Sequence, residues 1–148
     1  MRRRKNSPQD ALKDVRRFLK YRARSVAEVV RKLSDFGYDQ EVIDKTIETL
    51  KKTGEISDEE FAYIYASDML TVYGYGPFAI RRKLAQLGID EETALSVIDR
   101  VLSENDLNQV MLKILTLHKV SKGKIKDFLA RRGFSYDQIR GLNIEGGA

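Results

Sequence analysis

The chain contains no cysteine and only one histidine, His118. Without cysteine there can be no disulfide, no thiolate metal site and no cysteine nucleophile. A metal site needs several convergent ligands, and a catalytic triad needs a histidine beside a nucleophile and an acid. A single histidine at the end of an expected helix is better explained as a cation favoured by the helix dipole. The sequence therefore predicts no enzyme, no metal and no cofactor.

Proline and long apolar runs are also scarce. Pro8 and Pro77 are the only prolines, so long stretches lack the strongest helix breaker. No segment approaches the ~18 consecutive apolar residues of a transmembrane helix. The basic N-terminal residues are followed by no apolar run, so we expect no secretory signal peptide. Together with the missing cysteine, these features favour a cytoplasmic protein without membrane contact.

Charge is distributed unevenly along the chain. Residues 1–34 carry a net charge of +9, residues 35–75 carry −7 and residues 76–148 carry +3, which gives the overall +5. Basic ends suit a polyanion such as DNA. Solvated charge is also common on helical proteins, so charge alone leaves both interpretations open.

A short motif occurs three times: a leucine, a glycine four positions later, a hydrophobic residue, and then Asp or Ser. The glycines Gly37, Gly88 and Gly133 lie 51 and 45 positions apart, which is the length of a small helical module. A glycine after an apolar-periodic run is typical of a helix that ends in a left-handed conformation. The residue two positions later is a candidate N-cap, whose side chain accepts a hydrogen bond from the next helix. These candidates are Asp39, Asp90 and Ser135.

Apolar spacing at i, i+3, i+4 and i+7 predicts nine helices. We expect them near residues 8–21, 26–36, 40–53, 58–73, 77–87, 91–103, 106–118, 123–132 and 136–142. Ser25 with Glu28, and Ser57 with Glu60, match the capping-box pattern. The expected fold is all-α, with three tandem three-helix repeats of helix-turn-helix type in an elongated array, curved or straight. A flexible basic arm (1–9) precedes repeats at 10–56, 57–104 and 105–148, the last with a short tail.

Chemistry-bearing motifs are weak. Gly74-Tyr75-Gly76 lacks the third glycine of a dinucleotide fingerprint and follows no strand. Asp58, Glu59 and Glu60 lie in the first turn of a helix, where acids are favoured, although a divalent-ion site is the alternative. The tyrosines of the middle repeat fit packing better than base stacking.

Basic clusters are better represented, and contact with a polyanion is favoured over simple solvation. The candidate contact residues are Arg2, Arg3, Arg4, Lys5, Arg16, Arg17, Lys20, Arg22, Arg24, Arg81, Arg82, Lys83, Lys119, Lys122, Lys124, Lys126, Arg131 and Arg132.

The stretch Ser57–Ala62, followed by Gly74-Tyr75-Gly76-Pro77 and Gly88-Ile89, resembles the central module of RecX proteins. The first module is similar too, through Arg24-Ser25, Glu28 and Gly37. The resemblance covers roughly residues 10–140. Its structural motif consists of Asp58, Phe61, Ala62, Gly37, Gly74, Gly76, Pro77, Gly88 and Gly133.

The resemblance implies tandem three-helix repeats and a modulator of the RecA recombinase. RecX proteins bind the RecA–DNA filament in its helical groove, and they can bind DNA. They suppress ATP hydrolysis, strand exchange and RecA-assisted repressor cleavage, which links them to DNA repair, recombination and the SOS response.

One departure from the family pattern bears on the site. The helix after Phe61-Ala62 commonly carries arginines in the family, whereas residues 63–69 contain no Lys or Arg. This moves the expected basic contacts to residues 2–24 and 119–132. The first hypothesis is therefore a monomeric RecA-filament regulator. The alternatives are a stand-alone protein that binds single- or double-stranded DNA without sequence specificity, and a helical scaffold for another protein.

Overall fold

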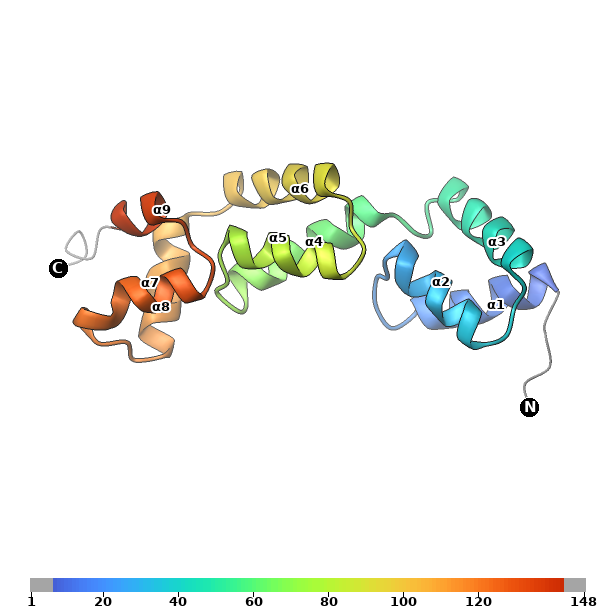
Figure 1. The fold of residues 1–148 in the computed structure, drawn as a ribbon, viewed down its shortest axis with the longest axis horizontal. Helices are drawn as coiled ribbons and strands as arrows, with labels where there is room; N and C mark the ends of the chain where they lie inside the picture. The colour runs from blue at the N-terminus through green and yellow to red at the C-terminus, as the bar shows by residue number, and fades with distance from the viewer. Residues whose placement is uncertain (1–6, 143–148) are drawn as a thin grey trace. The chain divides into compact units, whose positions relative to one another are not determined.

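The computed structural model describes residues 7–142, and in this range the chain is all-α, as predicted (Figure 1). Its nine α-helices all begin and end within two residues of the expected boundaries, and the described range contains no β-strand. The helices are α1 (Pro8–Leu19), α2 (Val26–Asp35), α3 (Gln40–Lys52), α4 (Asp58–Thr71), α5 (Pro77–Gln86), α6 (Glu91–Ser103), α7 (Leu107–Leu117), α8 (Ile125–Arg131) and α9 (Tyr136–Arg140). A 3₁₀ turn, η1 (Lys122–Lys124), precedes α8.

The turn chemistry explains why the sequence breaks where it does. Gly37, Gly88 and Gly133 have φ angles of 90°, 85° and 97°, so the predicted left-handed conformation is confirmed. The hydrophobic residue after each glycine is buried and packs back against the molecule: Tyr38, Ile89 and Phe134. Pro77 is the first residue of α5, where its fixed φ is favourable.

Most of the predicted N-caps are present. Ser25 forms the full capping box with Glu28, and Ser57 Oγ accepts from Glu60 N at 3.2 Å. At the second and third corners, Asp90 Oδ1 accepts from Thr93 N at 2.8 Å and Ser135 Oγ accepts from Gln138 N at 3.1 Å. At Asp39 the prediction is confirmed for the position and wrong for the bond. Asp39 is the N-cap of α3 and has the expected extended backbone, but its side chain makes no capping hydrogen bond.

The chain divides into two compact units. The N-terminal unit runs to Phe61 and includes Leu87–Ile89, and the C-terminal unit comprises Ala62–Gln86 and the residues from Asp90 onward. Among the described residues, no helix is long and apolar enough to cross a membrane.

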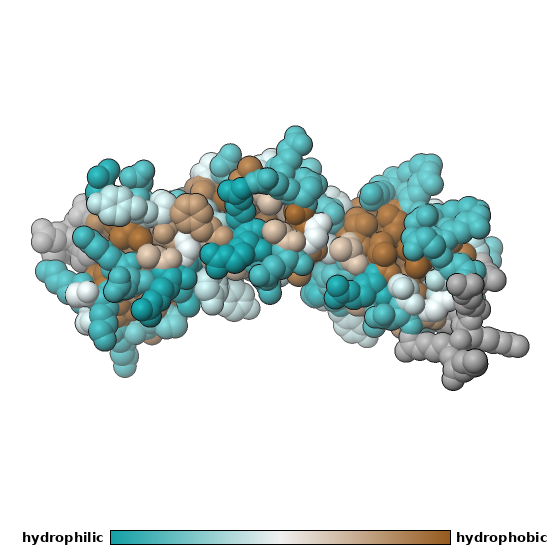
Figure 2. Space-filling model, viewed as in Figure 1, coloured by the Kyte–Doolittle hydropathy of each residue, from teal (hydrophilic) through white to brown (hydrophobic). Residues whose placement is uncertain are grey.

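The core of the N-terminal unit lies among α1, α2 and α3, which pack on one another. It is built from Val15 and Ala11 of α1, Val29 and Leu33 of α2, and the apolar face of α3: Val42, Ile43, Ile47 and Leu50. On the face shown in Figure 2, apolar side chains of this unit lie between hydrophilic ones at its surface.

The C-terminal unit has the same construction. Helices α5 and α6 pack together, and α8 packs on α9 and η1. Its buried side chains include Leu70, Ile80, Leu84, Ala94, Val97, Ile98, Val101, Met111, Ile114, Leu115, Leu129 and Phe134. The apolar side chains of each helix recur at helical spacing and form one stripe, and the helices pack so that these stripes are buried.

Candidate functional site

The structure sorts the candidate basic residues into two groups. Arg2, Arg3, Arg4 and Lys5 lie outside the described residues. Five of the others are held by acids or carbonyls of the same unit: Arg16, Arg22, Arg24, Arg81 and Arg132. The remaining nine form no ion pair with a described residue: Arg17, Lys20, Arg82, Lys83, Lys119, Lys122, Lys124, Lys126 and Arg131. From the sequence, the residues of both groups are predicted equally as contacts for a polyanion.

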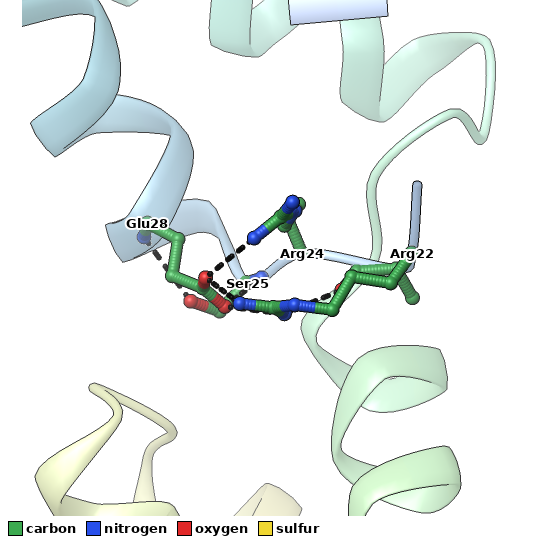
Figure 3. A network of polar contacts seen from close by, with 5 residues as sticks. Arg22, Arg24, Ser25 and Glu28 are labelled. Carbon is green, nitrogen blue, oxygen red and sulfur yellow. Dashed lines mark hydrogen bonds and ion pairs between the residues drawn. The ribbon is translucent and has the colours of Figure 1, made fainter. Parts of the chain in front are cut away.

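Arg22 and Arg24 converge on Glu28 at the start of α2 (Figure 3). Arg22 Nη2 lies 2.6 Å from Glu28 Oε2, and Arg24 Nη1 lies 3.6 Å from the same oxygen. Glu28 also accepts from the backbone N–H of Ser25, whose side chain is fully buried. The guanidinium of Arg24 lies 3.8 Å from the centre of the Phe18 ring, a cation–π contact. These arginines hold the start of α2 in place, and Glu28 neutralises one of their two positive charges.

The electrostatics of the Glu28 network follow from these contacts. Burial by itself raises the pKa of Glu28, but the hydrogen bonds from Arg22 and Ser25 and the two arginine charges lower it below the ordinary value. Arg16 forms a similar pair with Glu55, with Nε 2.9 Å from Oε2. The hydrogen bonds from Arg16 and Thr53 lower the pKa of Glu55. Both pairs stabilise the charged forms of their members.

Asp58 links two segments of the N-terminal unit. Its Oδ1 accepts from the backbone N–H of Val26 at 2.8 Å, so the first residue of α4 satisfies a free donor at the beginning of α2. The sequence explained Asp58 only as a first-turn acid and a family motif residue. No local pattern could have predicted this bond, because the two residues are 32 positions apart.

Arg132 connects the last corner of the C-terminal unit to the loop after α4. Its guanidinium donates to the carbonyl oxygens of Tyr73 and Gly74, the latter at 3.4 Å from Nε. The same group lies 4.2 Å from the centre of the Tyr75 ring. Arg132 is half-buried, whereas its neighbour Arg131 is exposed and unpaired within the described residues. Of these adjacent arginines, Arg131 is exposed, whereas the guanidinium of Arg132 is held in place by two carbonyl oxygens that leave its charge unneutralised.

Two glycines meet beside Arg132. Gly76 N donates to Arg132 O at 2.7 Å, and Phe78 N donates to Gly133 O at 3.0 Å. A Cβ atom added to Gly133 would lie 2.5 Å from Ala79 N, and one added to Gly76 would lie 2.5 Å from Gly133 C. Only glycine permits this approach of two backbones. The Gly74-Tyr75-Gly76-Pro77 segment is therefore a packing joint, which accounts for its glycines without a nucleotide.

The unpaired cations lie on both units. In the N-terminal unit, Arg17 and Lys20 line a solvent-open hollow of about 400 Å³ along α1, with Leu12 among its walls. In the C-terminal unit, Arg82 and Lys83 are exposed on α5, Lys119, Lys122 and Lys124 are exposed between α7 and α8, and Lys126 is exposed in the first turn of α8. Lys119 has a φ of 49°, so the chain turns sharply at this residue. Such an arrangement can bind phosphates by charge.

Metal and acid–base chemistry find little support in the described residues. They contain no group of three or more His, Cys, Asp or Glu that could hold a metal ion. His118 caps the C-terminus of α7, with its ring centre 5.3 Å from that of Phe128. The acids Asp58, Glu59 and Glu60 lie in the first turn of α4, as expected.

Comparisons with known proteins agree with this geometry. Three family models match in order: the first three-helix domain of RecX at residues 11–50, the second at 57–98 and the third at 118–141. The regulatory protein RecX of Thermotoga petrophila is 35% identical over 133 residues, which cover 88% of this chain and 82% of that protein. The chain belongs to the RecX family.

Further RecX proteins agree with this assignment. The regulatory protein RecX of Chlorobium phaeobacteroides is 33% identical and covers 84% of this chain and 85% of its own length. The crystal structure of RecX from Lactobacillus salivarius superposes with a TM-score of 0.75 at 25% identity, over 91% of this chain and 93% of that one. The three-helix organisation predicted from the glycine repeat is thus the organisation of the RecX family. The relatives from Thermotoga petrophila and Chlorobium phaeobacteroides are both named regulatory proteins.

Proposed function

We propose that this chain regulates the RecA recombinase by binding the RecA–DNA filament and inhibiting its ATPase, strand exchange and repressor-cleavage activities. Membership of the RecX family carries the proposal. The consequence for the cell is restraint of recombination, DNA repair and the SOS response in the cytoplasm. The chain acts by binding as a monomer and carries out no reaction of its own.

The charge distribution supports a ligand that presents both the negative phosphates of DNA and a positively charged protein surface. The unpaired cations of α1, α5 and the segment between α7 and α8 suit the phosphates of DNA. Helix α4 is different, because it carries Asp58, Glu59, Glu60 and Asp68 and has no basic residue. It suits a basic protein surface, which a filament of protein on DNA would also present. Several weak patches on one chain reinforce one another through effective concentration.

In this proposal the chain consists of three three-helix repeats, at residues 10–56, 57–104 and 105–148, preceded by a basic arm at residues 1–9. The links at residues 55–57 and 103–105 are the hinge candidates. Among the eighteen candidate contacts, the nine unpaired cations are the primary set in this proposal. Arg2, Arg3, Arg4 and Lys5 remain candidates from the sequence, because they lie outside the described residues.

The direct test is the DNA-dependent ATPase of purified RecA, measured with and without this protein. We expect inhibition at substoichiometric to equimolar amounts. An unchanged rate at a several-fold excess over RecA would refute the regulator proposal. Electron microscopy of the filaments in the same samples distinguishes a shortened filament from a coated one.

A stand-alone DNA-binding protein is the second candidate, favoured by the nine cations that form no ion pair with a described residue. It predicts affinity for bare DNA that falls steeply with salt, because each phosphate contact releases counterions. Titration of labelled DNA over a salt series checks this. Absence of binding at low salt, with RecA binding retained, would exclude this candidate and leave the first one standing.

A further inference from the structure

The C-terminal unit exposes aromatic rings around the joint between Gly76 and Gly133. Phe78 is 54% exposed, Tyr136 is 69% exposed and Tyr73 is 58% exposed. The segments that carry them meet at this joint: Phe78 N donates to the carbonyl oxygen of Gly133, three residues before Tyr136, at 3.0 Å, and the side chain of Arg132 donates to Tyr73 O. Large exposed aromatic side chains gathered at one place in a monomer often mark a binding surface. Packing in the described chain does not account for these rings.

Each of two helices pairs an exposed ring with an exposed arginine one turn later. On α5 the pair is Phe78 and Arg82, and Arg82 has no ion pair with a described residue. On α9 the pair is Tyr136 and Arg140, with the guanidinium 5.4 Å from the ring centre. Residues four apart lie on the same face of a helix, so each ring has a cation beside it.

The surrounding charge points to a polyanion rather than to an acidic or apolar protein groove. Residues 107–142 contain eight Lys or Arg and two acids, Asp127 and Asp137. Arg131, next to the joint, is exposed and unpaired within the described residues. Among polyanions, only an unpaired strand presents base faces to an aromatic side chain. The stacked bases of a duplex cover one another.

We propose that the surface formed by Phe78, Tyr136 and Tyr73 stacks the bases of single-stranded nucleic acid, while Arg82 and Arg131 contact its phosphates. This is the combination of base stacking and backbone charge that sequence-independent single-strand binding uses. Arg140 is paired with Asp137, with Nη2 3.5 Å from Oδ1, and is not counted among the phosphate contacts. The inference rests on the proposed binding of nucleic acid, and it adds that the bound form at this surface is single-stranded.

The test measures the purified protein alone, without RecA, by fluorescence anisotropy of a labelled oligothymidylate and of a duplex of equal length. The variant carries Phe78→Leu and Tyr136→Leu, which keep an exposed apolar side chain but remove the π faces. We expect about a tenfold or greater loss of affinity for the oligothymidylate and less than about a twofold change for the duplex. The aromatic swap Phe78→Tyr with Tyr136→Phe should retain wild-type affinity for both.

Two controls keep the result interpretable. Tyr21→Leu removes a ring that is 81% exposed in the N-terminal unit, and it should leave both affinities unchanged. The chain has no tryptophan, so Tyr136→Trp introduces a single indole whose emission should be quenched by the oligothymidylate and not by the duplex. Thermal melting by circular dichroism verifies that each variant is folded.

Several outcomes overturn the proposal. These are no binding of the oligothymidylate by the wild-type protein, an unchanged affinity in the leucine variant, or an equal loss for single strand and duplex. A leucine variant that keeps its oligothymidylate affinity but no longer binds RecA would identify the surface as a protein contact instead. Because RecA is absent from the stacking assay, its failure leaves the ATPase test of the regulator proposal unaffected.

Discussion

The two units join their segments partly by different contacts, and this difference bears on which cations are paired. In the N-terminal unit, the ion pair of Arg16 with Glu55 joins residues 39 positions apart, and Arg22 and Arg24 share Glu28. In the C-terminal unit, Arg81 pairs with Glu91, two backbones meet at glycines and Arg132 donates to two carbonyl oxygens. Lys122, Lys124 and Lys126 form no ion pair with a described residue. An exposed arginine in a sequence is therefore poor evidence of a ligand contact unless its acid partners are known.

The largest expected effect comes from crowding the backbone joint. Gly133→Ala places a Cβ atom 2.5 Å from Ala79 N and also imposes a φ of 97° on alanine. We expect a loss of about 3 kcal/mol in the free energy of unfolding, from the left-handed conformation together with overpacking. Gly54→Ala in the N-terminal unit is the matched control, because its φ is 74° but nothing lies within 4 Å of its Cβ. It should cost about 1 kcal/mol. Equal losses in urea unfolding would refute the crowding explanation.

The next effect tests the unpaired lysines. Reversing charge at Lys122, Lys124 and Lys126 together should lower DNA affinity about tenfold or more at low salt and reduce the slope of log affinity against log salt by about three. Because these side chains are exposed and form no ion pair with a described residue, the melting temperature should stay the same. The control is Lys45→Glu with Lys52→Glu in the N-terminal unit, where the lysines pair with Glu41 and Glu48. Unchanged binding of the triple variant would remove this segment from the contact surface.

Neighbouring arginines give the third test. Arg132→Ala removes the hydrogen bonds to two carbonyls and the contact with Tyr75, so we expect a loss of about 1–2 kcal/mol of stability. Arg131→Ala should leave stability unchanged and weaken DNA binding. Chemical denaturation and anisotropy on both variants measure the two effects. If Arg132→Ala and Arg131→Ala change stability and DNA affinity by the same amounts, the proposed difference between the structural role of Arg132 and the binding role of Arg131 is wrong.

The smallest effect concerns Glu28 and pH. Its folded-state pKa is lowered, so its charge contributes stability above the ordinary value of 4.5, and the contribution is lost as pH falls through the folded pKa. Glu28→Gln keeps the capping geometry but removes the charge, and at neutral pH it should cost less than about 1 kcal/mol because the network is partly solvent-exposed. The difference between wild type and variant should shrink as pH falls below 4.5 and through the lowered folded-state pKa of Glu28. A difference that persists in acid would show that packing, and not charge, accounts for it.

Sequence patterns predicted the fold well because helices are local. The capping box at Ser25, the proline that begins α5 and the left-handed glycines at each corner all involve residues within a few positions of one another. Asp39 is the exception. It has the residue type and backbone of an N-cap, but its side chain makes no capping hydrogen bond.

The candidate site was predicted less well, because partners were distant. Arg24 lies just before the N-cap of α2 and four positions before Glu28, and this short separation could have identified their pair. No such pattern connects Arg16 to Glu55, 39 positions away, or Arg132 to Tyr73, 59 positions away. The candidate contact residues predicted from the sequence therefore include cations that are held by partners within the chain and cations that form no ion pair with a described residue.

The sequence by itself determined the helices, most of their caps and the threefold repeat, because helix formation and capping depend on hydrogen bonds and apolar spacing within one or two turns. It indicated the family through the resemblance of the Asp58–Ala62 and Gly74–Gly88 elements to RecX proteins. Only the tertiary structure decided which cations keep their charge available, why Gly76 and Gly133 must be glycine, and which aromatic rings face solvent. Those properties depend on contacts between residues that are far apart in the sequence and come together only when the apolar faces of the helices are buried. Local sequence patterns do not identify such contacts.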